Sequence, residues 1–381
     1  MMRILYYFSV LLLWSACQPD DTSTNQEQLP PPQADYPIAE HKWGYIDRQG
    51  QVVIDAQYDD CREFVNGLAA VRIGGYWGYI DRDGREVASP KYKEAYSFCE
   101  GLGRVTTYEG HTTYINARGK EVLPLLPFTA DDFHEGRARF SQQGRWGYID
   151  REGKQVIPPL YDKATHFQNG VAVVQRGEKY GMIDLSGQEA LPFQFDRLWP
   201  FSEGRARAKK GSQVGYVDAK GQWTIDARWT QAGDFHQGLA PVQQQGQWGF
   251  IDTLGQVVSA PQWDYVAWGN AHRWIVSQAG KFGLLDAQAQ IVLEPKWDQI
   301  APFSEGLAPY MNDFLWGYLD TMGIAVTPPH FGLAWAFKEG LARVAFAEGI
   351  GFINKDGELV IAPNFLDVRD FSEGRARVQV K

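Results

Sequence analysis

The sequence predicts an all-β protein built from ten tandem repeats of 34 residues, each folded as three short antiparallel strands. The first observation is a phrase, WGYIDRQG at 43–50, that recurs almost unchanged as WGYIDRDG at 77–84 and WGYIDREG at 146–153. The second is that this phrase returns at a nearly constant spacing. The third is composition: 14% aromatic residues and 40 glycines in 381 residues are typical of many short strands joined by tight turns.

Aligned on its third residue, the phrase occurs ten times, with one spacing of 35 residues and eight of 34. These positions are Tyr45, Tyr79, Tyr114, Tyr148, Met182, Tyr216, Phe250, Leu284, Tyr318 and Phe352. The array fills residues 38–381, which we therefore expect to form one domain rather than several unrelated ones.

The first strand of each repeat is predicted over WGYID, which is dense in aromatic and β-branched residues. Alternation places Trp43, Tyr45 and Asp47 on one face. Gly44 lies on the other face and indicates that a neighbouring backbone or ring packs closely there. Asp47 and Gly50 form a D-x-x-G turn, in which the carboxylate accepts turn N–H groups and glycine adopts positive φ.

The second strand is predicted over QVVI and forms a hairpin with the first. Proline, as at Pro90 or Pro158, is expected to end it, because proline has no N–H to donate. The next segment, such as YDKATHF at 161–167, has no clear period and is compatible with one helical turn. An E-G turn then leads into a third strand, such as RARVQV at 375–380.

We expect the ten units to stack into an open or superhelical β-solenoid-like array, because ten blades exceed the four to eight that are usual for propellers. The alternative is a closed, propeller-like toroid. The array begins at a WG hairpin and ends on a third strand, so its last strand is placed to complete the first unit.

These columns resemble the WG (KWG) repeat family, with a pattern near K-W-G-Y-I-D-x-x-G, then P-x-Y-D, then F-x-E-G-L-A. The signature positions are Trp43, Gly44, Asp47, Gly50, Trp77, Gly78, Trp146, Gly147, Trp248, Gly249, Trp316 and Gly317. The resemblance implies a β-rich bacterial repeat protein, and it supplies no catalytic residues to transfer.

Residues 1–17 resemble a bacterial lipoprotein signal peptide. Arg3 is followed by the apolar run 4–14, which is too short to span a bilayer, and then by Ser15, Ala16 and Cys17. The resemblance implies that Cys17 is lipidated, although Trp14 departs from the usual leucine; an ordinary signal peptide with an incidental cysteine is the alternative. Residues 18–37 are predicted to be a flexible, proline-rich tether. We expect a cell-envelope protein anchored by lipid to the outer membrane. The acidic segment after Cys17 resembles a surface-export signal, and this resemblance implies exposure at the cell surface.

The composition and motifs exclude several functions. The net charge of −9 disfavours nucleic acid as a partner. Motifs of metalloproteases, α/β-hydrolases and P-loop NTPases are missing from the sequence, and we expect no cofactor, no metal and no enzyme activity. The aspartate column gives one carboxylate per repeat and tolerates Asn116 and Asn354, which favours turn capping over metal binding. Cys61 and Cys99 are either a disulfide or two separate buried residues.

One unit departs from the pattern. Gly269 and His272 replace the phenylalanine and glycine of F-x-x-G, and Trp274 stands where other units carry a small residue. Trp268 is extra, and Trp223 occupies a column of smaller residues. Because local rules tend to break at functional sites, we expect an exposed aromatic platform for sugar or peptide here.

The candidate binding residues are Trp268, His272, Trp274, Trp223 and Trp263, and the alternative is that Trp229, Trp263 and Trp297 are ordinary core. The leading hypothesis is a non-catalytic envelope lipoprotein whose repeat array binds an envelope protein or a glycan. A structural spacer without a ligand and an enzyme with a site formed across repeats are the other two. The sequence does not indicate the oligomeric state.

Overall fold

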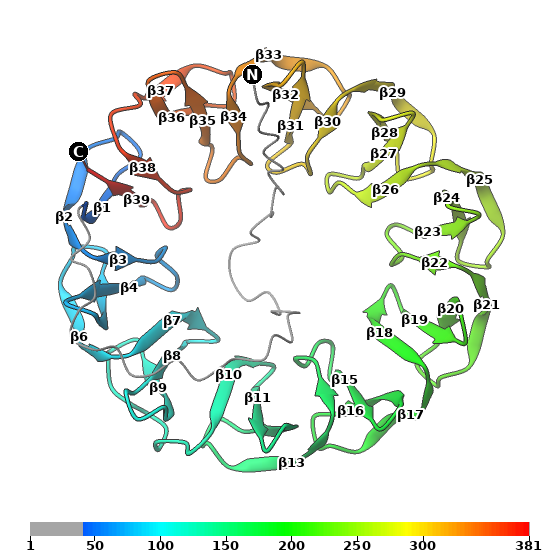
Figure 1. The fold of residues 1–381 in the computed structure, drawn as a ribbon, viewed down its shortest axis with the longest axis horizontal. Helices are drawn as coiled ribbons and strands as arrows, with labels where there is room; N and C mark the ends of the chain where they lie inside the picture. The colour runs from blue at the N-terminus through cyan, green and yellow to red at the C-terminus, as the bar shows by residue number, and fades with distance from the viewer. Residues whose placement is uncertain (1–40, 381) are drawn as a thin grey trace, which may run out of the picture.

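The structure, a computed structural model, describes residues 41–380. Within this range every regular element is a β-strand, and the strands form ten small antiparallel sheets. The sheets follow one another around a central opening (Figure 1). The fold is therefore all-β, as predicted, but the expected open array is wrong: the repeats form a closed, propeller-like ring of ten blades.

The ring closes because the first and last strands of the array share one sheet. Its strand order is β2-β1-β39-β38. The first strand β1 (Trp43–Ile46) pairs antiparallel with β39 (Ala376–Gln379), from Trp43 opposite Gln379 to Ile46 opposite Ala376. The last strand of the array therefore completes the first blade, as the sequence predicted for the closed alternative. Closure removes two sheet edges that an open array would leave unpaired.

We number the blades 1 to 10 from this closing sheet and letter the strands of each blade A to D. The A strands are β38 (Asp367–Val368), β3 (Asp60–Cys61), β7 (Glu94–Cys99), β10 (Thr129–His134), β14 (Lys163–Ala164), β18 (Arg197–Ser202), β22 (Gln231–Ala232), β26 (Tyr265–Trp268), β30 (Gln299–Ile300) and β34 (Leu333–Ala334). The B strands are β39, β4 (Leu68–Ile73), β8 (Leu102–Thr106), β11 (Arg137–Gln142), β15 (Val171–Arg176), β19 (Arg205–Lys210), β23 (Leu239–Gln244), β27 (Trp274–Gln278), β31 (Leu307–Asn312) and β35 (Ala342–Phe346). The C strands are β1, β5 (Tyr76–Asp81), β9 (Thr112–Asn116), β12 (Arg145–Ile149), β16 (Lys179–Asp184), β20 (Gln213–Val217), β24 (Gln247–Asp252), β28 (Lys281–Leu285), β32 (Leu315–Asp320) and β36 (Gly349–Ile353). The D strands are β2 (Val52–Tyr58), β6 (Glu86–Tyr92), β13 (Gln155–Tyr161), β17 (Glu189–Phe195), β21 (Trp223–Trp229), β25 (Val257–Trp263), β29 (Ile291–Trp297), β33 (Ala325–Phe331) and β37 (Leu359–Ile361).

Nine blades therefore have four strands rather than the predicted three. The additional strand is A, which replaces the expected helical turn after the Y-D pair. In six blades strand A is only two residues long, as in β3 and β14. An alternating pattern needs more residues than that, so it could not appear in the sequence.

Proline does not end the second strand of the predicted hairpin, as expected, but lies inside it. Pro90 is within β6 and Pro158 is within β13. Both strands are at the edge of their sheet, where a residue without an N–H group loses little hydrogen bonding.

The turn between strands C and D has the chemistry predicted from D-x-x-G. Asp47 Oδ1 accepts the N–H groups of Gln49 and Gln51 at 3.0 and 2.9 Å. Asn116 accepts the equivalent pair in blade 3, at 2.9 and 3.1 Å. At Gly44, an added Cβ would lie 2.5 Å from the carbonyl oxygen of Ile54, so strand D crosses this position too closely for any side chain.

Blade 3 is the exception, with only three strands. Thr113 stands at the position of the WG glycine, and its hydroxyl donates to the carbonyl of Leu123 at 2.8 Å. The following segment is joined to β9 by isolated bridges at Leu126 and Glu121 and by the N–H group of Val122, which donates to the carbonyl of Tyr114 at 2.9 Å. The blade that lacks the WG glycine is thus the blade that lacks a regular D strand.

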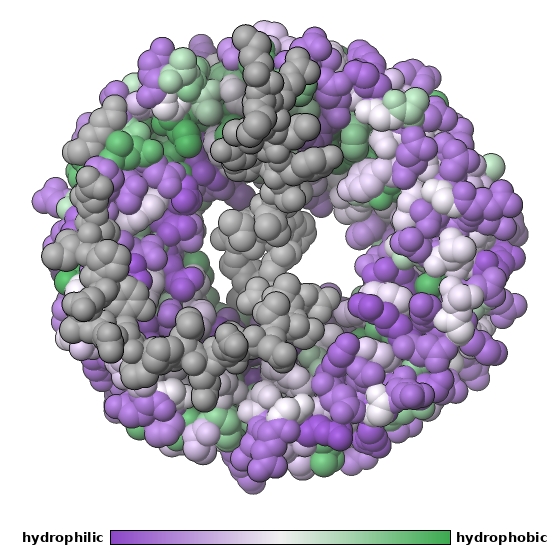
Figure 2. Space-filling view, viewed as in Figure 1, coloured by the Kyte–Doolittle hydropathy of each residue, from purple (hydrophilic) through white to green (hydrophobic). Residues whose placement is uncertain are grey.

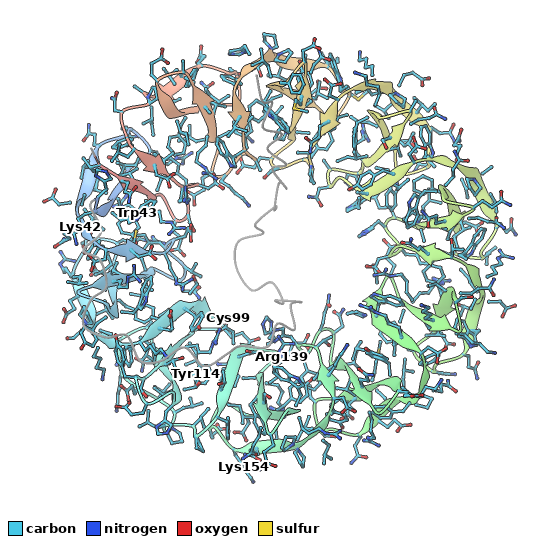
Figure 3. All side chains as sticks on the ribbon, in the orientation of Figure 1. Lys42, Trp43, Cys99, Tyr114, Arg139 and Lys154 are labelled. Carbon is cyan, nitrogen blue, oxygen red and sulfur yellow. The ribbon has the colours of Figure 1, made fainter. Side chains whose placement is uncertain are left out.

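The hydrophobic core is a circle of ten interfaces between neighbouring blades. At one interface, Tyr45 and Tyr58 of blade 1 pack with Phe64 and Val71 of blade 2. Side chains fill the spaces between neighbouring sheets (Figure 3). They leave an opening at the centre of the ring (Figure 2).

The disulfide between Cys61 and Cys99 that the sequence left open is not formed, because Cys61 is free and buried. Burial raises the pKa of the Cys61 thiol to about 12, which keeps it protonated and packed as a small hydrophobic residue.

Candidate functional site at the inner turns of the ring

The turns between strands A and B point toward the central opening (Figure 1). In nine blades this turn has two residues, both with left-handed backbone, such as Asn66 (φ 55°) and Gly67 (φ 80°). Hairpins with such turns favour glycine at the second position, which explains the E-G column of the sequence. The turns are Glu373–Gly374, Asn66–Gly67, Glu100–Gly101, Glu135–Gly136, Asn169–Gly170, Glu203–Gly204, Gln237–Gly238, Glu305–Gly306 and Glu339–Gly340.

Glutamates in these turns connect neighbouring blades. Glu135 accepts the N–H groups of Asn169 and Gly170 in the next blade, both at 2.7 Å. Glu373 accepts the N–H group of Gly67 at 2.8 Å, so the connection continues from the C-terminal hairpin to blade 2. We call this set the carboxylate ladder: Glu100, Glu135, Glu203, Glu305, Glu339 and Glu373.

Cations from the turns between strands C and D reinforce three members of the ladder. Arg151 pairs with Glu100 at 2.7 Å, Arg82 with Glu373 at 2.7 Å, and Lys355 with Glu305 at 3.1 Å. Burial alone would raise the pKa of each carboxyl group. The cations and backbone N–H donors outweigh burial, and the pKa of Glu100, Glu305 and Glu373 is lowered.

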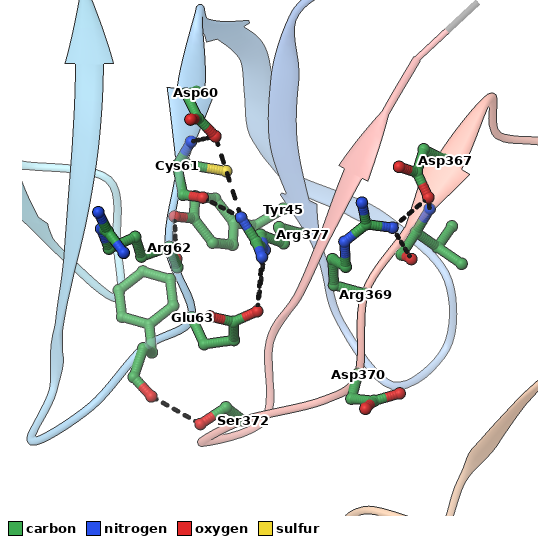
Figure 4. A network of polar contacts seen from close by, with 12 residues as sticks. Tyr45, Asp60, Cys61, Arg62, Glu63, Asp367, Arg369, Asp370, Ser372 and Arg377 are labelled. Carbon is green, nitrogen blue, oxygen red and sulfur yellow. Dashed lines mark hydrogen bonds and ion pairs between the residues drawn. The ribbon is translucent and has the colours of Figure 1, made fainter. Parts of the chain in front are cut away.

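The closing blade has a further set of polar contacts with blade 2 (Figure 4). Arg377 of β39 pairs with Glu63 at 2.8 Å and donates to the carbonyl of Cys61. Ser372 donates to the carbonyl of Phe64 at 2.6 Å. The C-terminal hairpin is thus fixed on both sides, by β1 within its sheet and by these groups in the next blade.

Blade 8 departs from the regular inner turn. Its turn has three consecutive left-handed residues that are not glycine: Asn270 (φ 63°), Ala271 (φ 47°) and His272 (φ 60°). Such conformations are costly for residues with a Cβ atom. The ladder glutamate is replaced in four turns, by Asn66, Asn169, Gln237 and Ala271. Ala271 is the one replacement without a polar side chain.

Trp274 is not exposed, as had been expected, but is 1% accessible in the core. Its ring lies 5.0 Å from that of Phe250, the same kind of contact that Tyr216 makes with Phe235 at 4.8 Å one blade earlier. Gly269 stands where other blades have a phenylalanine before the A–B turn, as at Phe235. The ring of Trp274 on the opposing strand fills the space that this phenylalanine would occupy. The two changes compensate each other, so this unit is repacked rather than degraded.

Trp268 and His272 lie at the inner turns, together with two residues from blade 7 that were not predicted. Trp268 is half-buried, and its ring stacks on His236, with centroids 4.8 Å apart and planes at 4°. Burial lowers the pKa of His236, which favours the neutral ring. His272 is exposed, and its ring contacts the side-chain amide of Gln237.

The remaining tryptophans of the expected platform lie elsewhere. Trp263 is 3% accessible in strand D of blade 7, packed in the interface with Trp274. Trp223 is half-buried in strand D of blade 6, with its ring 6.0 Å from Phe195. The expectation of an exposed platform is therefore wrong for Trp263 and Trp274, because these residues fill the space between blades.

The described residues contain no group of three or more His, Cys, Asp or Glu side chains placed to hold a metal ion. They also include no helix that is long and apolar enough to cross a membrane. A shallow hollow beside Asn66 and Asp83 is lined by Arg82 and Glu373, which are already paired with each other. The ladder glutamates of the inner turns thus accept backbone N–H groups, and three of them also pair with cations.

The sequence profile described as "WG containing repeat" matches residues 43–77, 77–108, 146–180, 180–213, 215–248, 248–267, 282–313, 316–346 and 350–381. The chain belongs to this WG-repeat family. The profile leaves out residues 109–145, which include the C–D turn of the three-stranded blade 3, and residues 268–281, which include the irregular turn of blade 8. Both gaps in the profile match a departure in the structure. No curated protein matches the sequence.

Several solved structures resemble the WG-repeat ring at low identity. A eukaryotic initiation factor is 10% identical, covering 75% of this chain and 94% of its own, with a TM-score of 0.45. Hsv2 of Kluyveromyces lactis is 10% identical, covering 58% and 90%, with a TM-score of 0.35. BamB from Moraxella catarrhalis is 10% identical, covering 89% and 98%, with a TM-score of 0.32. None of these similarities is close enough to indicate a function.

Acid is expected to weaken the ring through the ladder. A carboxyl group whose pKa is lowered on folding contributes stability above its unfolded pKa, near 4.3, and loses this contribution as the pH falls through its folded pKa. We expect the variant Glu100→Gln/Glu305→Gln/Glu373→Gln to be less stable than wild type at pH 7. The difference should shrink below about pH 4. Urea unfolding between pH 7 and pH 3 measures this, and a difference that stays constant would contradict it.

Trp274 and Trp268 are expected to respond differently to truncation. Trp274→Ala removes a buried ring and should lower the free energy of unfolding by about 3–5 kcal/mol. Trp268→Ala removes a half-buried ring and should cost about 1 kcal/mol. Thermal and urea unfolding compare the two. The double variant Gly269→Phe/Trp274→Ala restores the arrangement of the neighbouring blades and should recover part of the loss; equal costs for the two single variants would contradict the assigned roles.

Proposed function

We propose that this WG-repeat protein is a non-catalytic interaction module that binds a partner at the inner turn of blade 8. The observation that carries the proposal is the coincidence, at one turn, of three departures from the repeat. The turn has three left-handed residues with side chains, and it has Ala271 where the other nine turns have glutamate, asparagine or glutamine. It also places Trp268 and His272 beside His236 and Gln237.

The regular positions support this assignment because they are occupied by structural roles. The aspartates cap turns, the WG glycines admit strand D, and the ladder glutamates accept backbone N–H groups of the next blade. Residues with such roles are not available for a ligand. The strained turn of blade 8 also contacts blade 9, where Asn270 donates to the carbonyl of Phe303 at 3.2 Å, but it leaves His272 exposed. Backbone strain of this kind is a feature found at functional sites.

We further propose that the ring acts in the bacterial cell envelope, held to the outer membrane by a lipid on Cys17 and separated from it by residues 18–37. Support comes from the sequence alone, since these residues lie outside the described part of the chain. A lipid anchor would keep the ring near a surface, where a binding module meets partners at high local concentration.

The binding proposal is tested by crosslinked co-purification of the tagged protein from native envelopes. We expect a partner to be captured by wild type and lost from the variant Trp268→Ala/His272→Ala. Trp274 is left intact because its removal would destabilise the core. Tyr265→Ala, an exposed residue of the same strand β26, is the control and should retain the partner. Equal capture by the double variant and the control would place the site elsewhere.

The anchoring proposal is tested by the substitution Cys17→Ala. Without the acyl chains, which add about 0.8 kcal/mol of membrane affinity per methylene, the protein should move from the membrane fraction to the soluble fraction. Fractionation with immunoblotting measures this, and a variant of Ser15 serves as a processing control. Membrane association that survives Cys17→Ala would contradict the lipid anchor.

A further inference from the structure

Exposed aliphatic side chains gather around the irregular turn of blade 8. Leu254 is 73% accessible, Met322 59% and Ile324 63%. Leu254 lies in the C–D turn of blade 7, and the other two lie in and just after the C–D turn of blade 9. These are the blades on either side of blade 8.

In the other repeats the same positions are polar. The residues equivalent to Leu254 and Met322 are Gln49, Asp83, Arg118, Glu152, Ser186, Lys220, Gln288 and Asp356. The residues equivalent to Ile324 are Gln51, Arg85, Lys120, Lys154, Gln188, Gln222, Gln256, Gln290 and Glu358. All three aliphatic exceptions in these two columns therefore occur in the two blades that flank the irregular turn.

Contacts between the turns of blades 7, 8 and 9 connect these residues. Arg273, next to His272, donates to the carbonyl of Thr321 at 2.6 Å and lies 3.8 Å from the sulfur of Met322. On the other side His272 contacts Gln237. Gly238 follows Gln237, and a Cβ on it would lie 4.0 Å from the methyl group of Thr253, the neighbour of Leu254. In an antiparallel sheet the A–B turn and the C–D turn lie at the same end, so all these groups share one end of three adjacent blades.

The C–D turns of this surface lack a cation that several other blades carry. The first residue after the capping aspartate or asparagine is arginine or lysine in blades 1, 2, 4 and 10, and it is uncharged in blade 3 and in the five successive blades 5 to 9. Three charged groups remain at this surface, and all are engaged with backbone groups. Asp252 and Asp320 accept N–H groups of their own turns, and Arg273 donates to backbone carbonyls.

The geometry of Trp268 disfavours a sugar. Glycans stack on an open aromatic face. One face of Trp268 is covered by the parallel ring of His236, and Trp274 packs against Trp268 at 4.9 Å with planes at 71°. Flexible methionine and exposed aliphatic side chains are instead typical of surfaces that bind proteins.

We propose that the surface formed by Leu254, His272, Met322 and Ile324, called here the aliphatic surface, binds a protein partner through uncharged, apolar side chains of that partner. The inference rests on the proposed function, because it names the class of partner for the same site. A lipid bilayer is the competing occupant, and the vesicle measurement described below tests it.

The repeats provide matched positions for the experiment. The photo-crosslinking residue p-benzoylphenylalanine is placed at 254 or 322 in the full-length protein in its native cells, and at 49 or 356, the equivalent positions of blades 1 and 10, as controls. We expect the same protein to be crosslinked from 254 and from 322, and not from 49 or 356. That protein is then purified and its affinity for the ring is measured directly.

With the purified partner, Leu254→Ser/Met322→Ser is expected to weaken binding at least tenfold, and Gln49→Ser/Asp356→Ser less than twofold. Crosslinks from all four positions, from none, or to a second copy of this chain would overturn the inference. So would binding to vesicles of phosphatidylethanolamine and phosphatidylglycerol that is lost in the Leu254/Met322 variant. If Trp268→Ala/His272→Ala loses its partner while Leu254→Ser/Met322→Ser keeps it, the aliphatic surface is wrong and the binding module stands; if neither variant loses a partner, both proposals fail.

Discussion

The pairing of β1 with β39 is the constraint on which the rest of the structure depends. These strands lie at opposite ends of the array, yet they form adjacent members of one sheet. Their pairing forces ten repeats to return to their starting point, so each interface between blades must turn the chain by nearly the same amount. The near-constant spacing of 34 residues is the sequence counterpart of this requirement.

Equal interfaces between blades require the same residues at the same positions, and the repeated columns of the sequence supply them. A single four-stranded blade cannot bury both of its faces, so the core exists only between blades. Polar contacts follow the same plan. The hydroxyl of Tyr45 donates to the carbonyl of Arg62 in the next blade at 2.7 Å, and Tyr216 makes the equivalent bond to Gly233 at 2.8 Å. The ladder glutamates repeat this blade-to-blade connection at the inner turns.

Much of the local structure could be predicted from the sequence. The strand over WGYID, the capping role of Asp47 and the close approach at Gly44 depend only on neighbouring residues. Strand A could not be predicted, because two residues such as Asp60 and Cys61 carry no period. Closure could not be predicted either, because the usual number of propeller blades argued against the topology that the offset of the array suggested.

The candidate site shows the same division. The sequence identified the irregular unit, since Gly269, His272 and Trp274 break fixed columns. It could not show that Trp274 fills the space left by Gly269, because the compensation is made across the hairpin and against Phe250 of another blade. His236 and Gln237 were missed because they sit one repeat earlier and become neighbours of Trp268 and His272 only in the ring. The charged pairs of the KWG lysine were missed for a similar reason: Lys281 and Asp298 are 17 residues apart and meet through the D strand.

The ring therefore separates two kinds of residue, those repeated in every blade that build the interfaces, and the few exceptions that gather at blades 7 to 9. This division holds only if the array is closed.

The most direct test is a distance measurement by double electron–electron resonance, with spin labels on the exposed C–D turns of a variant in which the native cysteines are replaced. The closed ring predicts that labels at 49 and 356, in blades 1 and 10, give the same distance as labels at 49 and 83, in blades 1 and 2. A much longer distance for the first pair would show that the ends of the array are apart and would contradict the ring.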